Sequence, residues 1–315
     1  MPHTATPLSL RAIVVAGSAN VDLMLSVPHL PKPGETVAGG GFATEAGGKG
    51  ANQAVAAAKL GAPVVFVGCV GGDAFGTQAI GALAATGVDV THLHVLAGHT
   101  TGVAMVLNDA AGENCIALDP GANDRLAPAH VDGAVDAIAN AALLICQLES
   151  PLATVAHALQ TARWLGVPAL LNPAPAQALP DELLQGLRFL VPNALEASLM
   201  TGIEVTDAAS AERAARQLRE RGVDTVLLTR GADGVTLVDA SGVEHFPGRR
   251  VQAVDSTGAG DTFVGAFASA WRRGLPVAQA VEFAQGAAAF SVCSRGAQAS
   301  MPTQADAAAD FAQPA

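Results

Sequence analysis

The chain has 315 residues, a formal net charge of −11 and a pI of about 5.0, and hydrophobic residues make up 50% of it. This length suits one large α/β domain or two small ones, and the negative charge argues against a nucleic-acid or anionic-membrane partner. The four cysteines lie far apart, which disfavours a zinc site or a disulfide framework. With neither a signal-peptide pattern nor an apolar run of membrane length, we expect a soluble, cytoplasmic protein.

The first predicted strand of the main sheet covers residues 12–16, after a flexible tail over residues 1–10. Its sequence, AIVVA, is a short apolar run that ends at Gly17, as in a buried parallel strand. Asn20 and Asp22 follow at once. Because ligands bind beyond the carboxyl ends of strands in open α/β sheets, both side chains are candidate ligand contacts. A simple turn, which Asn and Asp also favour, is the alternative.

A small second sheet is predicted outside the main one. Residues 35–42 follow a stretch that is broken by prolines, and residues 101–107 and 114–118 flank an AAGE turn, as in a hairpin. We expect these segments to form a β lid over about residues 20–45 and 98–120. Such a lid would exclude water from a reaction beneath it.

A glycine-rich turn at residues 47–50, GGKG, leads into a helix predicted over residues 51–60. Glycine often follows a helix C-terminus, as Gly61 does here, and Asn52 lies in the first turn. The pattern is not a Walker A loop, because Gly50 stands where Ser or Thr is required. Lys49 is therefore a candidate ligand contact rather than the lysine of a known phosphate-binding loop.

Predicted helices and strands alternate along the rest of the chain, which is typical of a parallel sheet flanked by helices. We expect helices over residues 76–85, 129–139, 151–165, 208–221, 261–273 and 276–290, and strands over residues 64–67, 143–147, 169–171, 189–191, 225–229, 235–238 and 244–246. Polar residues recur just after strand ends, where they could line one cleft: Asn20, Asp22, Glu149, Asn172, Asn193 and Thr229.

The stretch VDSTGAGD at residues 254–261 combines three features. Gly258, Ala259 and Gly260 are small residues that let backbone N–H groups point to one spot, a helix pattern begins directly after them, and Asp261 lies in its first turn. Helix N-termini attract anions, which a neighbouring carboxylate would repel. We therefore interpret the stretch as an anion hole for a phosphoryl group, with Asp261 as the general base for the acceptor hydroxyl. A carboxylate that merely favours the helix dipole is the alternative.

Two of these motifs together resemble those of the ribokinase branch of the PfkB-type sugar kinases, and the resemblance covers nearly the whole chain. They are GGKGANQAVAAAKLG at residues 47–61 and VDSTGAGDTFVGAF at residues 254–267, and the segments QLESP, LNPAPA, VPNALEA and LTRGADGV are similar too. The resemblance implies an α/β fold with a mostly parallel central sheet flanked by helices and a small β lid. It also implies ATP-dependent phosphorylation of D-ribose at its 5-hydroxyl, with Mg²⁺ and K⁺, in a homodimer that pairs through the lid.

The resemblance further implies a role for each matched residue. Asp261 is expected to be the general base, and Gly258, Ala259 and Gly260 the anion hole. The expected ribose contacts mix carboxylates, amides and an ammonium, which suits a sugar with several hydroxyls: Asn20, Asp22, Gly48, Lys49, Asn52 and Glu149. The expected nucleotide contacts are Asn193, Thr229, Gly231, Ala232, Gly234, Gly260 and Gln285. Glu196 is expected to bind Mg²⁺ through water, and the expected ligands of a monovalent cation are Asp255, Thr257, Ser291, Ser294, Gly296 and Ser300.

Some alternatives stay open at individual residues and for the function. Asn193 and Glu196 could instead cap a helix, and Gln285 stands where the family often has His or Asn near the nucleotide. Ser256 stands where the family usually has Thr or a similar residue, and Ser291 and Ser294 could simply lie on a helix face.

A kinase of another sugar or of a nucleoside is the nearest alternative function, because a pocket discriminates weakly between similar sugars. A non-catalytic sugar-binding regulator is disfavoured by the intact Asp261, anion hole and Glu196. A dinucleotide-dependent dehydrogenase is excluded, since GSANVD follows the first strand instead of GxGxxG.

Overall fold

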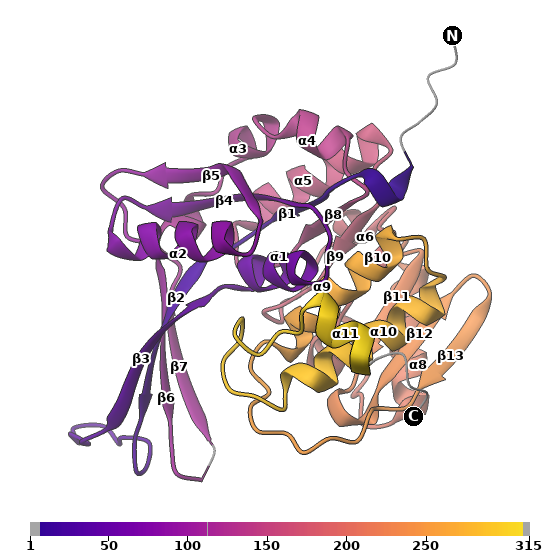
Figure 1. The fold of residues 1–315 in the computed structure, drawn as a ribbon. Coiled ribbons are helices and arrows are strands. Elements are labelled where there is room, and N and C mark those ends of the chain that lie inside the picture. The colour runs from indigo at the N-terminus through magenta and orange to yellow at the C-terminus, as the bar shows by residue number, and fades with distance from the viewer. Residues whose placement is uncertain (1–6, 112, 311–315) are drawn as a thin grey trace.

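A computed structural model of the chain describes residues 7–111 and 113–310. Its centre is a nine-stranded sheet (Figure 1) whose strands pair in parallel, except for two antiparallel pairings at one edge. In spatial order its strands are β13 (Gly242–Phe246), β12 (Val235–Asp239), β11 (Thr225–Thr229), β10 (Phe189–Leu190), β9 (Ala169–Leu171), β8 (Leu143–Cys146), β1 (Ile13–Ala16), β4 (Val64–Gly71) and β5 (Asp89–Leu96). The mostly parallel central sheet expected from the sequence is confirmed.

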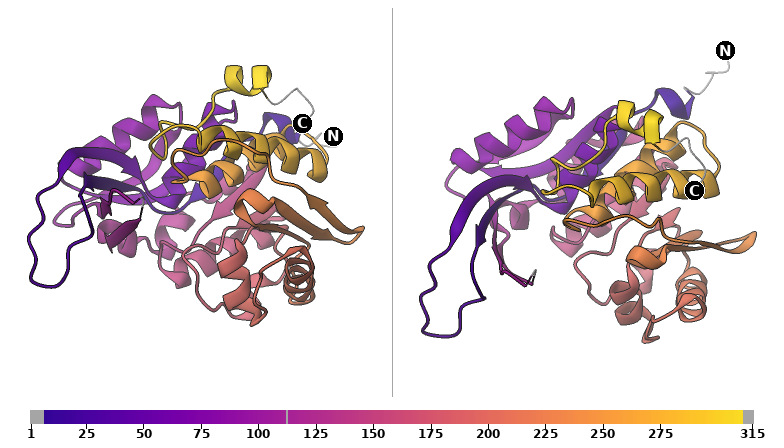
Figure 2. Two further views of the ribbon diagram at one scale, coloured as in Figure 1. Left: turned by 90° about the horizontal axis from the view of Figure 1, so that it is seen from below. Right: turned by 60° about the horizontal axis from the view of Figure 1, so that its bottom comes forward.

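Helices cover both faces of this sheet, because the strands bury apolar side chains on both sides. In β1, Ile13 and Val15 join the core beneath one helical layer, and Val14 and Ala16 join the core beneath the other. The first layer contains α1 (Lys49–Lys59), α2 (Ala74–Ala85), α9 (Ala259–Arg272), α10 (Val277–Ser291) and α11 (Gln304–Asp310). The second contains α3 (Pro128–Asp132), α4 (Val135–Ala139), α5 (Leu152–Leu165), α6 (Asp181–Leu184), α7 (Ala194–Thr201) and α8 (Ala208–Glu220). Figure 2 shows the two layers on opposite sides of the sheet. Within the described residues, no helix is both long enough and apolar enough to span a membrane.

A second, four-stranded sheet projects from one end of the first (Figure 1). Its strands, in spatial order, are β3 (Gly40–Gly47), β2 (Asn20–Ser26), β6 (Gly102–Asn108) and β7 (Asn114–Asp119). The segments predicted as a hairpin form β6 and β7, and Gly112 of the turn between them lies outside the described residues. Strand β2 was not predicted, and β3 begins later than the strand expected over residues 35–42.

Several predicted boundaries were wrong. The single helix expected over residues 129–139 is two short helices, α3 and α4, because the first ends at Gly133. Helix α1 begins at Lys49 rather than at residue 51. The edge strand β5 and the helix α11 were not predicted, and α7 was foreseen only as the helix that Asn193 and Glu196 could cap. Short 3₁₀ turns complete the described elements: η1 (Leu8–Leu10), η2 (Gly121–Arg125) and η3 (Gly231–Asp233).

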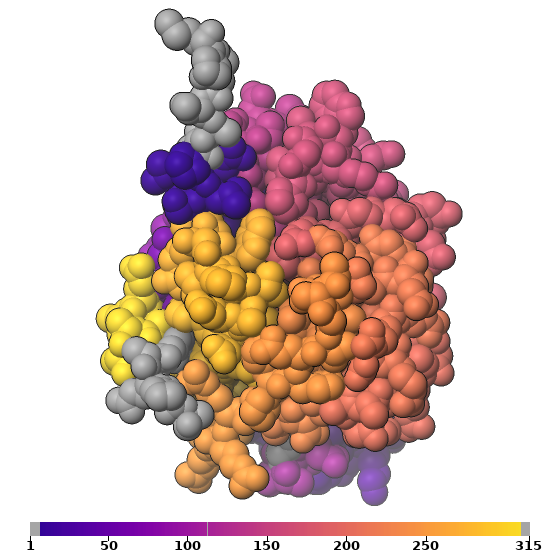
Figure 3. Space-filling model, turned by 90° about the vertical axis from the view of Figure 1, so that its right-hand side faces the viewer, coloured from indigo at the N-terminus to yellow at the C-terminus, as the bar shows by residue number. Residues whose placement is uncertain are grey.

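The N-terminal turn is tied to helix α9. The Arg272 side chain donates hydrogen bonds to the backbone oxygens of Arg11, at 2.5 Å, and Ser9, at 2.6 Å. Figure 3 shows this indigo turn resting against the gold C-terminal part of the chain. Of the tail expected over residues 1–10, residues 1–6 lie outside the described part, and so do residues 311–315 of the expected domain.

Candidate active site

The N-termini of α1 and α9 meet beside the ends of β9, β10 and β11. The two helices pack closely because Gly265 lies against Ala56: a Cβ at position 265 would be 2.5 Å from the Ala56 Cβ. This approach brings Lys49 and Asp261 to one pocket of about 210 Å³. The residues that line it come from α1, α9 and the segments that follow the strands: Lys49, Asn172, Ala174, Val191, Asn193, Glu196, Thr229, Gly258, Gly260, Asp261 and Val264.

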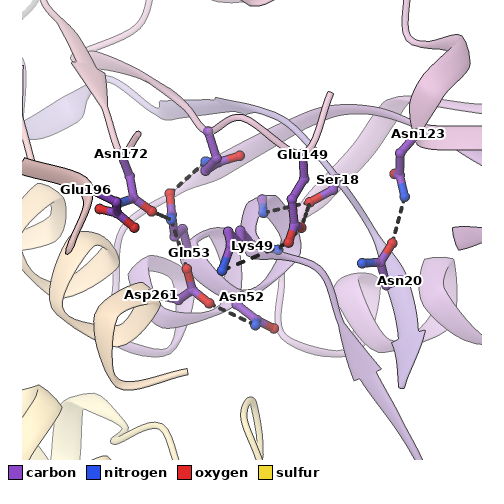
Figure 4. Close-up of polar contacts among 12 residues, drawn as sticks. Ser18, Asn20, Lys49, Asn52, Gln53, Asn123, Glu149, Asn172, Glu196 and Asp261 are labelled. Atoms are coloured by element: carbon purple, nitrogen blue, oxygen red, sulfur yellow. Dashed lines mark hydrogen bonds and ion pairs between the residues drawn. The ribbon is translucent and has the colours of Figure 1, made fainter. Parts of the chain in front are cut away.

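The carboxylate of Asp261 is held by two amides (Figure 4). Asn52 Nδ2 donates to its Oδ2 at 3.0 Å, and Gln53 Nε2 donates to its Oδ1 at 2.9 Å. The side chain is 8% exposed. Burial raises the pKa of Asp261 above its ordinary value, while the Lys49 ammonium and the two amide donors oppose this. The residue is therefore a buried carboxylate at the pocket wall, where a general base would be within reach of a bound hydroxyl.

Lys49 faces several carboxylates from the start of α1. Its Nζ lies 3.9 Å from Glu149 Oε1, and its backbone N–H donates to Glu149 Oε2 at 3.0 Å. Ser18 Oγ donates to the same Oε2 at 2.6 Å. Burial lowers the pKa of the ammonium, but the charges of Asp261, Glu149, Glu196 and Asp22 outweigh it and raise the pKa overall. Lys49 therefore stays protonated in a strongly acidic pocket.

The expected sugar contacts Asn20 and Asp22 lie on β2, next to Gly48. Asn20 Oδ1 accepts a hydrogen bond from Asn123 Nδ2 at 2.6 Å, which fixes the direction of its amide. Asp22 has a pKa raised to about 6 by burial and by the charges of Glu149, Glu45 and Asp261. Gly48 leaves no room for a side chain, because a Cβ there would be 2.8 Å from the Asn20 backbone nitrogen.

Asn193 and Glu196 form a capping box at the start of α7. Asn193 Oδ1 accepts from the Glu196 N–H at 2.8 Å, and the Glu196 carboxylate accepts from the Asn193 N–H at 2.8 Å and from Nδ2 at 2.9 Å. The helix-cap alternative is therefore correct, and both residues line the pocket as well. Burial raises the pKa of Glu196, and the Asn193 N–H and the Lys49 charge oppose this.

Of the other expected nucleotide contacts, Thr229 borders the pocket, the next three lie in the loop that follows it, and Gln285 lies on α10. Gly231 and Ala232 belong to the exposed turn η3, and Gly234, with a φ of 92°, ends it. The Gln285 side chain donates to the backbone oxygens of Phe246, at 3.4 Å, and Pro247, at 3.1 Å. Its amide therefore braces the segment after β13.

The residues expected around a monovalent cation surround the loop before α9. Asp255 Oδ1 accepts from the Thr257 N–H at 2.9 Å, and Oδ2 accepts from the Gly296 N–H at 3.0 Å. Burial raises the pKa of Asp255, but these donors outweigh it and hold the pKa below its ordinary value. Ser291 and Ser300 are buried and donate to the backbone oxygens of Ala288 and Ala297, whereas Ser294 is exposed. Among the six expected ligands of the cation, hydrogen bonds thus connect Asp255 with Thr257 and with Gly296.

Three amide residues that shape the site, Gln53, Gln147 and Gln298, were not predicted. Gln53 and Gln147 form a chain of amides behind Asp261 with Asn172, which was expected to line the cleft and does so, and Gln298 Nε2 donates to Asn52 Oδ1 at 3.0 Å. The signal in the sequence is weak: each is an amide residue beside apolar or small neighbours, as in LLICQLE for Gln147. Such residues are usually hydrogen-bonded when buried, but the sequence does not say to what.

A larger cavity, of about 460 Å³, lies between α9, α10 and α11 and shares no residue with this pocket. Half of its lining residues are alanines, and the others are Arg273, Phe283 and Gln304. We place the active site in the smaller pocket, because carboxylates with shifted pKa values, an ammonium and a helix N-terminus converge there.

Comparison with known proteins gives a consistent result. Residues 10–304 match the family described as pfkB family carbohydrate kinase. A ribokinase of Haemophilus influenzae is 44% identical over 93% of this chain and 96% of that protein. A deoxyribokinase of Salmonella typhi is 38% identical over 92% of this chain and 95% of that protein. The structure of Arabidopsis thaliana ribokinase complexed with ribose and ATP has a TM-score of 0.89 at 32% identity, covering 96% of this chain and 99% of the other.

Proposed function

The chain belongs to the pfkB family of carbohydrate kinases, and we propose that it transfers the terminal phosphoryl group of ATP to the 5-hydroxyl of D-ribose. One observation carries the proposal: the buried carboxylate of Asp261 lies in the first turn of a glycine-capped helix, in the same pocket as Lys49. A base beside an anion-binding helix end suits transfer of a phosphoryl group to a hydroxyl. The ribokinases among the relatives support ribose as the acceptor.

In the proposed reaction, Asp261 accepts the proton of the 5-hydroxyl as the hydroxyl oxygen attacks the γ-phosphorus of ATP. The bond between the γ-phosphorus and the bridging oxygen breaks, and ADP leaves. The N–H groups of Gly258, Ala259 and Gly260 at the start of α9 stabilise the charge that develops on the transferred group. In the structure the Ala259 N–H donates to Ser256 O at 3.2 Å, so this N–H would turn toward the phosphoryl group when it arrives.

The ribose hydroxyls would be bound by Asn20, Asp22, Gly48, Lys49, Asn52 and Glu149. Fixed amides and carboxylates support this assignment, because a buried polar group with one free bonding direction selects a hydroxyl at one position. Asn52 also donates to Asp261, so it would couple the sugar site to the base.

ATP would lie along Asn193, Thr229, Gly231, Ala232, Gly234, Gly260 and Gln285, with its phosphates toward Gly260 and the α9 N-terminus. Glu196 suits Mg²⁺ bound through water, because its carboxylate lies at the pocket wall and Mg²⁺ keeps most of its waters. When bound, Mg²⁺ neutralises phosphate charge.

A monovalent cation such as K⁺ would be held near Asp255, Thr257, Ser291, Ser294, Gly296 and Ser300. One carboxylate among neutral oxygens suits a weakly hydrated monovalent ion better than a divalent one. The ion would steady the loop before α9 without contacting the sugar.

The second sheet would act as a lid over the sugar and as the contact between two subunits of a cytoplasmic homodimer. Exposed apolar side chains on its strands support pairing, since they would be buried in a dimer: Phe42 at 66%, Met105 at 58%, Ile116 at 57% and Leu118 at 46% exposed.

A 2-deoxyribose kinase is the second candidate, because the deoxyribokinase of Salmonella typhi is 38% identical to this chain, the same identity as the ribokinase of Staphylococcus aureus. An ADP-release assay with ribose, 2-deoxyribose, other sugars and nucleosides decides between them. We expect the highest kcat/KM with ribose. No ADP release with any of them would reject the kinase and favour a sugar-binding regulator.

A further inference from the structure

A chain of three buried amides ends on the carboxylate of Asp261. Gln53 is 0% exposed and Gln147 is 1% exposed. Gln53 Nε2 donates to Asp261 Oδ1 and to Asn172 Oδ1, both at 2.9 Å, and Gln147 Nε2 donates to Gln53 Oε1 at 2.6 Å. Figure 4 shows Gln53 between Asn172 and Asp261. This hydrogen-bonded chain of amides joins α1 to the segments that follow β8 and β9.

The direction of the Gln53 amide is set by Asn172 and Asp261, whereas Gln147 Oε1 is buried with no hydrogen-bond partner among the described residues. Asn172 Nδ2 donates to the backbone oxygen of Val191 at 2.9 Å, so its Oδ1 faces Gln53. The Gln147 amide meets the oxygen of Gln53, so both N–H groups of Gln53 face acceptors. A reversed Gln53 would set its oxygen against the Asp261 carboxylate and against Asn172 Oδ1, which both lack a donor. Gln53 must therefore donate to Asp261.

The second oxygen of Asp261 is held in a similar way. Asn52 Nδ2 donates to Oδ2 at 3.0 Å, while Asn52 Oδ1 accepts from Gln298 Nε2 at 3.0 Å. Each carboxylate oxygen thus has one directed donor. These two bonds fix the plane of the carboxylate and leave its remaining lone pairs for the pocket.

We propose that Gln53 is a positioning residue for the catalytic base, and that Gln147 and Asn172 hold Gln53 in the orientation this requires. The inference rests on the proposed function, in which Asp261 takes the proton of the acceptor. Gln53 is fully buried, so it acts on the reaction through Asp261.

The donors have an electrostatic effect as well as a geometric one. Burial raises the pKa of Asp261, and Lys49, Asn52 and Gln53 oppose it. The other charged groups that face this carboxylate are acidic: Glu149, Asp22 and Glu196. Loss of the Gln53 donor therefore makes the anionic base harder to form at neutral pH.

Gln53→Met tests the proposal, because methionine is close to glutamine in length and has no amide. We expect kcat to fall about tenfold, as for loss of one hydrogen bond to a charged group. The acid limb of the kcat–pH profile should move to higher pH, while the Kd for ribose by calorimetry should change less than about threefold. An acid limb that coincides with the wild-type limb overturns the proposal.

Two further variants separate positioning from general loss of structure. Ser269→Ala removes another buried hydrogen bond of α9, from Ser269 Oγ to Leu60 O at 3.1 Å, and should leave the pH profile unchanged. Gln147→Met releases Gln53 without touching Asp261, and should move the acid limb in the same direction by a smaller amount. If Gln53→Met does not fold, Gln147→Met replaces it as the test. A kcat–pH profile of Gln147→Met that equals the wild-type profile then overturns the proposal.

A measurement without turnover distinguishes this inference from the proposed function. The carboxyl carbon of Asp261 can be followed by ¹³C NMR, with its resonance assigned by its loss in Asp261→Asn. Its titration midpoint should be higher in Gln53→Met than in the wild type. An unchanged midpoint overturns the role of Gln53, whereas absence of sugar phosphorylation by the wild type overturns the proposed function instead.

Discussion

Helices α1 and α9 begin alike but use their N-termini differently. Each starts at a glycine with positive φ, Gly48 at 89° and Gly258 at 74°, and no described side chain caps either helix. Within the described residues, side chains cap α2, α7 and α8, namely Asp73, Asn193 and Asp207, and Thr303 Oγ1 accepts from the Asp306 N–H at the start of α11. A side-chain cap satisfies helix N–H groups, whereas a glycine leaves them to another partner.

The partners differ at the two glycine-capped ends. At α1 the protein itself supplies them: the Lys49 N–H donates to Glu149, and the Gly50 N–H donates to Ser18 Oγ at 3.3 Å. At α9 the first turn opens to the pocket, where Gly260 is exposed. One helix end therefore holds a carboxylate of the protein in place, and the other is open to an anionic ligand. The same local motif has two uses, which are decided by whether a distant side chain reaches it.

The largest expected effect comes from Asp261→Asn at the α9 end. This change keeps the shape of the side chain and removes the base. Turnover should fall by roughly 10²–10⁴-fold, the usual contribution of general base catalysis. Ribose affinity, measured by calorimetry, should change far less, and near-normal turnover would contradict the assignment of Asp261 as base.

At the α1 end, Glu149→Gln should affect binding rather than chemistry. It removes the charge that faces Lys49 Nζ and weakens the acceptor for Ser18 and the Lys49 N–H. We expect the KM for ribose to rise about 10–100-fold, because hydrogen bonds to charged groups are lost, and kcat to fall less. Glu220→Gln makes the same exchange at an exposed position and is the matched control. A large fall in kcat with an unchanged KM for ribose would contradict the assignment of the α1 end to binding and the α9 end to chemistry.

The two glycine-capped ends could be predicted from the sequence, because each is encoded in one short stretch with Lys49 or Asp261 beside it. Most of the central sheet was predictable too, since buried parallel strands are short apolar runs. The edge strand β5 was missed, because its sequence DVTHLHVL has mixed polarity and it is exposed along one side. The amides Gln53 and Gln147 were missed for another reason: they pair across 94 residues, which no local pattern encodes.

Removal of the monovalent cation that we propose near Asp255 should lower turnover through the N-terminus of α9, without affecting the N-terminus of α1. Asp255 holds the loop before α9 through Thr257 and Gly296, and a bound K⁺ would steady the same loop. With Mg²⁺ and ATP saturating, replacing KCl by a bulky organic cation salt of equal ionic strength should lower turnover about tenfold, because preorganised donors lose their support. NaCl should restore less than KCl, and Asp255→Ala should abolish the difference. Equal turnover in all salts would mean that the protein alone holds the loop.

The smallest expected effect is on the free energy of unfolding, through the Asp22 carboxyl near the N-terminus of α1. The pKa of Asp22 is about 6 in the folded protein, against an ordinary value of 3.8. Below pH 3.8 the carboxyl is protonated in both states. Between 3.8 and 6 the unfolded chain loses this proton first, so the free energy of unfolding falls as pH rises. Above pH 6 the Asp22 carboxyl is ionised in both states, and its effect on the free energy of unfolding no longer changes with pH.

Asp22→Asn removes this titration and should therefore raise the free energy of unfolding at alkaline pH. Each pKa unit corresponds to about 1.4 kcal/mol, and solvent screening reduces what is measured, so we expect a gain of about 1–2 kcal/mol at pH 8. Urea unfolding at a series of pH values should show the gain shrinking to near zero below about pH 4. Asp124→Asn, which exchanges aspartate for asparagine at an exposed position, is the control. A gain that is independent of pH would mean that Asp22 is not held in the acidic surroundings of Glu149, Glu45 and Asp261.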